Sequence, residues 1–141
     1  MVNLNRFMAH VSRRQRREPI EQLEGWVETF GRWSLVFGLE KPDKVLSRQW
    51  AAASAAWLIV AGADIYADTS WGHLDGKPTP LDDTVMKGKL WAKRLYSGAT
   101  VEMRWDFWKA RLQEIAGDES YDEFTREAVK EAEVAMRNLE C

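Results

Sequence analysis

Eight tryptophans in a chain of 141 residues constrain this fold more than any other feature of the sequence. Tryptophan has the largest apolar side chain, and its indole N–H needs a hydrogen-bond partner when it is buried. Trp26 and Trp33 are seven residues apart, as are Trp50 and Trp57, and this spacing of two helical turns places each pair on one helix face. So many large rings must either fill a core or line a cavity. The full set is Trp26, Trp33, Trp50, Trp57, Trp71, Trp91, Trp105 and Trp108.

Apolar residues recur with a helical period along almost the whole chain, and no segment alternates in the manner of a β-strand. The pattern predicts helices over about residues 3–16, 19–37, 43–68, 80–96, 101–116 and 121–139. Because the sequence has no repeat, low-complexity stretch or interdomain linker, we expect residues 1–141 to form a single domain. We therefore predict an all-α fold, a single compact bundle of five or six helices.

The third predicted helix is apolar nearly all round in its middle, which is typical of a helix at the centre of a bundle. Residues 50–63 carry no charged side chain, but this run is too short to cross a bilayer, which takes about 20 apolar residues. Its many alanines allow neighbouring helices to approach closely, and Trp50 and Trp57 fill the volume that the alanines leave. We expect a central helix rich in alanine and tryptophan, and no membrane partner.

Local signals predict helix ends and core faces. Asn3 fits the N-cap of the first helix, Gly38 the C-cap of the second, and Ser120 with Glu123 a capping box for the sixth. The expected core residues are Leu4, Phe7, Met8 and Val11 in the first helix, Val101, Trp105, Trp108, Leu112 and Ile115 in the fifth, and Tyr121, Phe124, Ala128, Ala132, Ala135 and Leu139 in the sixth.

Composition excludes several classes of function. With a formal net charge of −2 and 30% charged residues, the chain has no electrostatic signature of nucleic-acid binding. Cys141 is the one cysteine and cannot form an internal disulfide, so a reducing, cytoplasmic setting is expected. His10 and His73 lie in different predicted elements, and no metal-ligand spacing occurs, so we expect no metal. The chain also lacks a nucleophile motif and a phosphate-binding loop, and we expect no cofactor.

The first predicted helix ends in the basic run Arg13, Arg14, Arg16 and Arg17, and no acidic residue precedes Glu18. This pattern superficially matches a mitochondrial presequence, but the apolar stripe of the same segment favours a helix of the domain. Arginines at a helix C-terminus complement the helix dipole and stay solvated. Binding of an acidic partner is the alternative.

Two stretches of the chain resemble a known family. Asn3-Leu4-Asn5-Arg6-Phe7-Met8-Ala9 resembles the opening motif of an uncharacterised family of all-helical fungal proteins, and Arg104-Trp105-Asp106-Phe107-Trp108-Lys109-Ala110-Arg111-Leu112 resembles a motif near that family's C-terminus. Between them, Ala52 to Gly62 resembles its alanine-rich helix. The resemblance implies a helical fold and a fungal source, and it carries no catalytic residue to this chain. Members tend to be longer, which implies a shortened bundle here that could expose apolar surface and form a homodimer.

Asp64 and Tyr66 are the candidate catalytic residues. Asp64 follows the apolar run Leu58 to Ala63 in the presumed central helix, and Tyr66 lies just beyond it. A carboxyl group in apolar surroundings has a raised pKa and can act as a general acid or hydrogen-bond donor. The alternative is that Asp64 lies near the helix end, where it is hydrogen-bonded or solvated.

The tryptophans are the candidate binding residues. Packing in the core is the default interpretation, and the alternative is a pocket for an apolar ligand, between the second, third and fifth helices, covered by the loop over residues 69–79. The candidate substrate-binding residues are Trp26, Trp33, Trp50, Trp57, Trp71, His73, Trp105 and Trp108.

These observations leave two classes of function open. The first is a small cofactor-free enzyme of fungal secondary metabolism, which binds an apolar small-molecule intermediate and promotes its cyclisation or isomerisation. Holding a flexible substrate in a reactive conformation and polarising it with a few donors can supply that catalysis without a nucleophile. The second is a non-catalytic helical protein-interaction module or an apolar ligand carrier. An exposed tryptophan stripe favours the second class, and an internal cavity favours the first.

Overall fold

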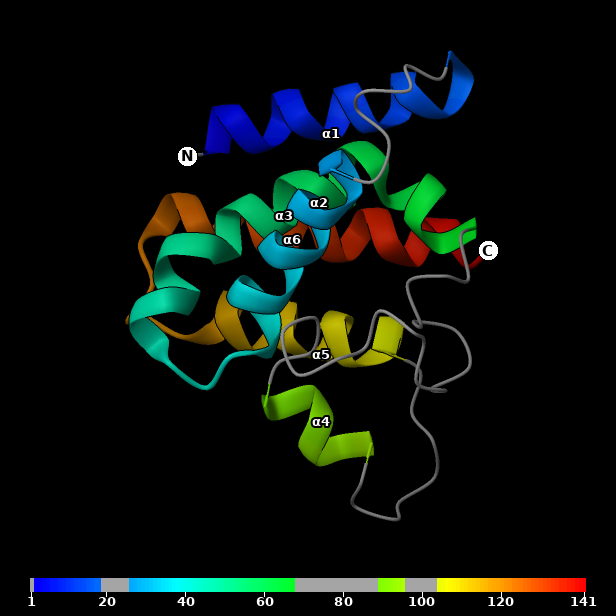
Figure 1. The fold of residues 1–141 in the computed structure, drawn as a ribbon. Helices are drawn as coiled ribbons and strands as arrows, with labels where there is room; N and C mark the ends of the chain where they lie inside the picture. The colour runs from blue at the N-terminus through cyan, green and yellow to red at the C-terminus, as the bar shows by residue number, and fades with distance from the viewer. Residues whose placement is uncertain (1, 19–25, 68–88, 96–103) are drawn as a thin grey trace.

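The computed structural model describes residues 2–18, 26–67, 89–95 and 104–141, and every regular element in these ranges is helical (Figure 1). This result confirms the predicted all-α fold. The elements are α1 (Val2–Arg17), α2 (Trp26–Leu35), the π-helical turn η2 (Val36–Glu40), α3 (Lys44–Ala67), α4 (Lys89–Leu95), α5 (Arg104–Gly117) and α6 (Glu123–Leu139).

The central element of the bundle is α3, which packs against α1, α2, η2 and α6. In Figure 1, α1 lies above α3, α6 lies behind it, and α5 and then α4 lie below. Residues 51–58 of α3 are all buried, because five alanines and one serine leave room for neighbouring helices on every side and Trp57 fills the remaining space. By length and composition α3 could also cross a membrane, but the core helix of a bundle passes the same test.

The buried face of α1 differs from the predicted one. Asn5, Met8, Ala9 and Ser12 face the core, whereas Phe7 is 62% exposed and Leu4 is 53% exposed. The expected stripe was therefore wrong at Leu4 and Phe7, because Asn5, which accepts hydrogen bonds from α2 and α3, turns this face of the helix toward the core. The helix also begins at Val2, so Asn3 is not its N-cap.

The second predicted helix does not end at Gly38. The helix α2 runs directly into η2, which contains Gly38 and ends at Glu40 (the predicted start of this helix, residues 19–25, lies outside the described residues). A Cβ atom at Gly38 would lie 2.8 Å from the carbonyl oxygen of Trp50. The glycine is therefore explained by close packing of η2 on α3, and the C-cap prediction was wrong.

The start and the buried face of α6 also differ from the prediction. Its N-cap is Asp122, whose carboxylate accepts a hydrogen bond from the backbone N–H of Thr125, so Ser120 does not cap it. This hydrogen bond lowers the pKa of Asp122, because it favours the ionised form. The buried face includes Thr125, Val129, Ala132 and Met136, whereas Phe124 is 60% exposed.

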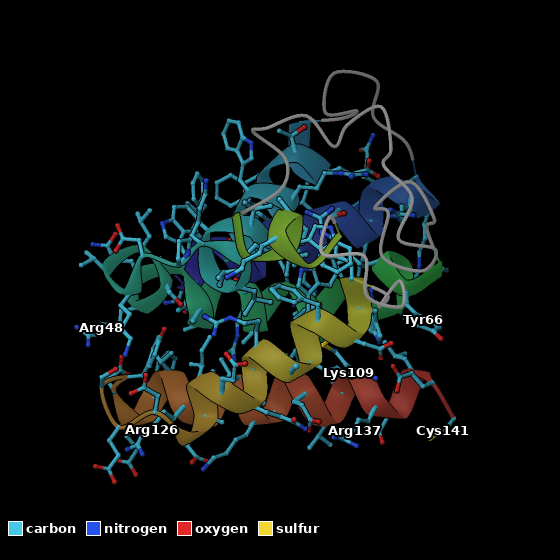
Figure 2. The ribbon with its side chains drawn as sticks, turned by 90° about the horizontal axis from the view of Figure 1, so that it is seen from below. Arg48, Tyr66, Lys109, Arg126, Arg137 and Cys141 are labelled. Carbon is cyan, nitrogen blue, oxygen red and sulfur yellow. The ribbon has the colours of Figure 1, made fainter. Side chains whose placement is uncertain are left out.

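The fifth helix matches its predicted core face, since Trp105, Trp108, Leu112 and Ile115 are all buried. Figure 2 shows α5 beside α6, with Lys109 between them. The ammonium group of Lys109 pairs with Glu140 and, at 2.9 Å, with Asp106. Partial burial opposes the effect, but these two carboxylates raise the pKa of Lys109 and hold the ends of α5 and α6 together.

Candidate functional site

The structure places the described tryptophans mainly in the core. Trp57, Trp105 and Trp108 are buried, Trp50 is partly buried against Phe37, and Trp33 is exposed. The side chain of Trp26 lies outside the described residues, as do Trp71, His73 and the loop over residues 69–79.

The candidate tryptophans form separate groups. The rings of Trp105 and Trp108 lie 6.2 Å apart in an edge-on arrangement, and Tyr66 packs on Trp105 at 4.9 Å. Trp57 packs instead on Phe30, at 6.5 Å. The structure thus brings Tyr66 together with the tryptophans of α5, but it does not gather the whole candidate set around one space.

Asp64 lies in a partly solvated setting. Its carboxylate is 3.8 Å from Arg13 Nε, and its side chain is 35% exposed. The hypothesis of a general acid requires apolar surroundings, which this position does not provide. The arginines at the end of α1 are similarly engaged, since Arg14 pairs with Glu18 and Arg16 with Glu28.

A buried polar cluster that the sequence analysis missed joins α1, α2 and α3. The Oδ1 atom of Asn5 accepts hydrogen bonds from Trp57 Nε1 at 2.8 Å and from Ser34 Oγ at 2.7 Å. Ser54 Oγ donates to the backbone carbonyl of Ser34 at 2.7 Å. The indole N–H that a buried tryptophan must satisfy is therefore satisfied by an asparagine on another helix.

A buried ion pair joins η2 to α5. The Nε and Nη2 atoms of Arg104 donate to the two carboxylate oxygens of Glu40, at 2.6 and 3.0 Å. Trp108 Nε1 donates to the same carboxylate at 2.8 Å, and the Arg104 guanidinium lies over the Trp91 and Trp108 rings, 5.9 and 5.6 Å from their centroids. Both charged side chains are almost completely buried.

These two clusters include polar residues of the two resembling motifs. Asn5 belongs to the first motif, and Arg104 and Trp108 belong to the second. The second motif could have pointed to Arg104, but no sequence signal marks Glu40, since an acidic residue beside Lys41 and Pro42 is expected at the surface. In both clusters the carboxylate and amide oxygens already accept hydrogen bonds, so we assign them a structural role.

Among the described residues, α1, α3 and α6 enclose a groove with a volume of about 520 Å³. We call it the α1/α3/α6 groove. Ala52, Ala56 and Ile59 of α3 lie at its base, where α1 and α6 both pack on α3. Ala52 and Ala56 are 5% and 2% exposed, and Ile59 is partly buried. Its remaining lining residues are Val2 and Arg6 of α1 and Phe124, Glu127, Ala128, Lys130, Glu131 and Val134 of α6.

The two sides of this groove, which we call its α1 bank and its α6 bank, combine apolar and charged side chains. Phe124 and Val134, on the α6 bank, are 60% and 54% exposed. Lys130 pairs with Glu127 at 2.7 Å, which lowers the pKa of that carboxyl group. Within the described part of the chain, neither Arg6 nor Glu131 has an ion-pair partner. The groove therefore presents one unpaired positive charge from α1 and one unpaired negative charge from α6.

Comparison with known proteins gives the family of the chain. The model of a family described as "Protein of unknown function (DUF3632)" matches residues 1–112. The chain belongs to this family. The matched range includes α1, α2, α3 and the motif residues of α5, whereas α6 and its bank of the groove lie beyond it. No curated protein and no solved structure matches the chain.

Proposed function

We propose that this member of the DUF3632 family is a non-catalytic protein-interaction module, which docks a segment of a partner protein in the α1/α3/α6 groove. The observation that carries the proposal is the groove itself, together with Phe124 and Val134, which are 60% and 54% exposed on its α6 side. Exposed apolar residues that gather around a hollow are typical of a binding surface. An aromatic side chain at its edge is a common anchor for a protein partner.

The placement of the tryptophans supports this class over a Trp-lined pocket. The indole N–H groups of Trp57 and Trp108 already donate hydrogen bonds to Asn5 and Glu40 inside the core, so neither is left to bind a ligand. Among the tryptophans whose side chains the structure describes, none lines the α1/α3/α6 groove. Its volume would also suit an apolar small molecule, but its charges on both banks favour a polypeptide, which can carry matching charges along its length.

The other class of function that the sequence left open, a cofactor-free cyclase or isomerase, stays a prediction. One contact favours it, the packing of Tyr66 on Trp105, which places a phenol beside the aromatic group of α5. Trp71 and His73, which would complete such a pocket, lie outside the described residues.

A peptide selection tests the docking function. A random library displayed on phage is enriched on the wild-type protein, and the affinities of the recovered peptides are then measured by fluorescence anisotropy. Since Phe124 is the expected anchor, we expect Phe124→Ala to weaken their binding at least about tenfold. Val45→Ala, an exposed apolar residue that does not line the groove, is the matched control and should leave affinity unchanged. Peptides that bind both variants as well as wild type would overturn the proposal.

A further inference from the structure

We propose that the outer face of α1 is a docking surface for an anionic membrane, in which Leu4 and Phe7 enter the bilayer interface and neighbouring arginines contact lipid phosphate groups. The two apolar residues do not line the α1/α3/α6 groove, so this surface is separate from the proposed function. The sequence-based expectation of no membrane partner rested on the shortness of the charge-free run in α3, which bears on crossing a bilayer. A helix that lies on the bilayer surface needs no such run.

The fold holds two large apolar side chains of α1 in solvent. Phe7 is 62% exposed and Leu4 is 53% exposed. On the side of the helix that faces the core, Asn5 Oδ1 accepts hydrogen bonds from Trp57 and Ser34. A rotation of α1 that buried Leu4 and Phe7 would break both hydrogen bonds, so the tertiary structure enforces their exposure. Exposed apolar residues that lie together are typical of an interaction surface.

Helical spacing arranges the outer face of α1 as two adjacent stripes. The first consists of residues separated by three, four and three positions, namely Leu4, Phe7, Val11 and Arg14. The second has a similar spacing and consists of Arg6, His10, Arg13 and Arg17. Apart from Val11 and Arg13, which are partly buried, all these residues are exposed. In Figure 1, α1 is the uppermost helix and the other labelled helices lie below it, so the stripes are at the outside of the bundle.

The charge of the chain is distributed unevenly, and α1 is its most basic part. This helix contains five of the 20 lysines and arginines of the chain and none of its 22 aspartates and glutamates. The net charge of −2 therefore averages a positive helix with an acidic remainder. Near an anionic surface, such a distribution of charge turns the positive helix toward that surface.

The ion pairs of these arginines leave them able to contact phosphate groups. Within the described residues, Arg17 has no ion-pair partner. Arg14 and Glu18 form a pair in which both side chains are more than two-thirds exposed, and such pairs are weak in water. Arginine can also extend its guanidinium group toward the lipid headgroups while its methylene groups stay against apolar surface.

The combination of the two stripes favours a membrane over an acidic protein or a nucleic acid. Arginines alone would suit any polyanion. Phenylalanine and leucine beside arginines are instead typical of helices at a membrane interface, where apolar side chains lie below the headgroups and basic ones lie among the phosphates. The two contributions add, because the same orientation of α1 brings both stripes to the bilayer.

Binding to lipid vesicles tests this surface. The full chain is mixed with phosphatidylcholine vesicles that contain no phosphatidylserine or about 30% of it, and the bound fraction is measured by sedimentation. We expect binding to the anionic vesicles alone. Phe7→Ala should weaken it about fivefold, and the double variant Arg14→Gln, Arg17→Gln at least about tenfold. All three side chains are exposed, so the melting temperature should not change.

Matched controls come from exposed positions on α3. Val45→Ala removes an equally exposed apolar side chain, and Arg48→Gln removes an exposed positive charge. Both variants should bind the vesicles like wild type. Phe124→Ala should do so as well, since this residue belongs to the α1/α3/α6 groove. Weaker vesicle binding by Phe124→Ala would place the contact at the groove and would overturn the assignment to α1.

A polarity-sensitive fluorophore shows which part of the protein enters the bilayer. It is attached to Asn3→Cys, an exposed position next to Leu4, in a chain that also carries Cys141→Ser. The control is the otherwise native chain labelled at the exposed Cys141. We expect anionic vesicles to raise the emission severalfold at residue 3 and to leave it unchanged at residue 141.

Three results would overturn the proposal. The first is that anionic vesicles are not bound, and the second is that the α1 variants bind them as well as wild type does. The third is an equal change of emission at the two labelled positions. Arginine-dependent binding to heparin without binding to vesicles would identify an acidic macromolecule as the partner, and the membrane surface would then be wrong.

Discussion

At the scale of single residues, the specificity of this core depends on polar side chains buried among aromatic ones. Glu40 accepts hydrogen bonds from Arg104 and Trp108, and Asn5 accepts them from Trp57 and Ser34. Each acceptor lies on a different helix from most of its donors, so each fixes how two helices meet. Apolar packing alone tolerates small rotations and shifts of one helix against another. When two helices share a buried hydrogen bond, the same movement leaves a donor and an acceptor unpaired, which costs free energy.

Removing Glu40 should therefore destabilise the protein severely. We expect Glu40→Ala to lower the free energy of unfolding by about 3–5 kcal/mol, because Arg104 stays buried without a counter-charge. The matched control is Glu114→Ala, which removes the exposed partner of Arg111 and should cost at most about 1 kcal/mol. Urea denaturation followed by tryptophan fluorescence measures both variants. Similar losses for the two variants would show that the buried pair has no special role.

At the scale of helices, the rotation of each element about its axis was the part that the sequence predicted least well. Hydrophobic spacing placed α5 correctly, because its core face consists of large apolar residues alone. It failed on α1 and α6, whose buried faces include Asn5, Ser12 and Thr125. In α1, the hydrogen-bond partners of Asn5 lie on α2 and α3, which the local sequence does not reveal. In α6, the buried Thr125 donates to Asp122 at the start of the same helix, while its neighbour Phe124 is exposed.

Two glycines in helical elements give a prediction at the same scale. Gly38→Ala should destabilise the protein by about 1–3 kcal/mol, because the new Cβ would lie 2.8 Å from the backbone oxygen of Trp50, which cannot rotate away. Gly62→Ala is the matched control inside α3. Among the described residues its Cβ would meet Leu139 Cδ1 alone, at 3.4 Å, so we expect it to stabilise the helix by about 0.5–1 kcal/mol.

Thermal unfolding followed by circular dichroism distinguishes the two glycine variants. The melting temperatures should move in opposite directions, by a few degrees per kcal/mol. A Gly38→Ala protein as stable as wild type would mean that η2 can move away from α3 without loss.

At the scale of the whole molecule, α6 completes the bundle, although the residues that match the family model all lie before it in the chain. The match ends at residue 112, within α5, but α3 makes its most extensive contacts with α6. Val129, Ala132 and Met136 of α6 are completely buried. Residues beyond the matched range therefore belong to the same core, and they also supply one bank of the proposed docking groove.

Truncation tests this dependence on α6. A chain that ends at Gly117 should lose cooperative thermal unfolding, because it exposes the apolar face of α3 that α6 covers. The control is a chain that lacks Cys141 alone, which is exposed and should melt like the full chain. Calorimetry measures both. A truncated chain that keeps a sharp transition would show that residues 2–117 form an independent core.

The sequence by itself determined the helical class, the position of the central helix and the core face of α5. These follow from local spacing, since a helix with alanine and tryptophan on all sides must be surrounded by other helices. Only the tertiary structure decided which tryptophans share a neighbourhood, which polar residues are buried and where the surface is hollow. The Glu40–Arg104 pair joins residues 64 positions apart, and the α1/α3/α6 groove forms where two distant helices pack on α3. Such features depend on how helices approach one another in space, and the period of any single helix carries no information about that approach.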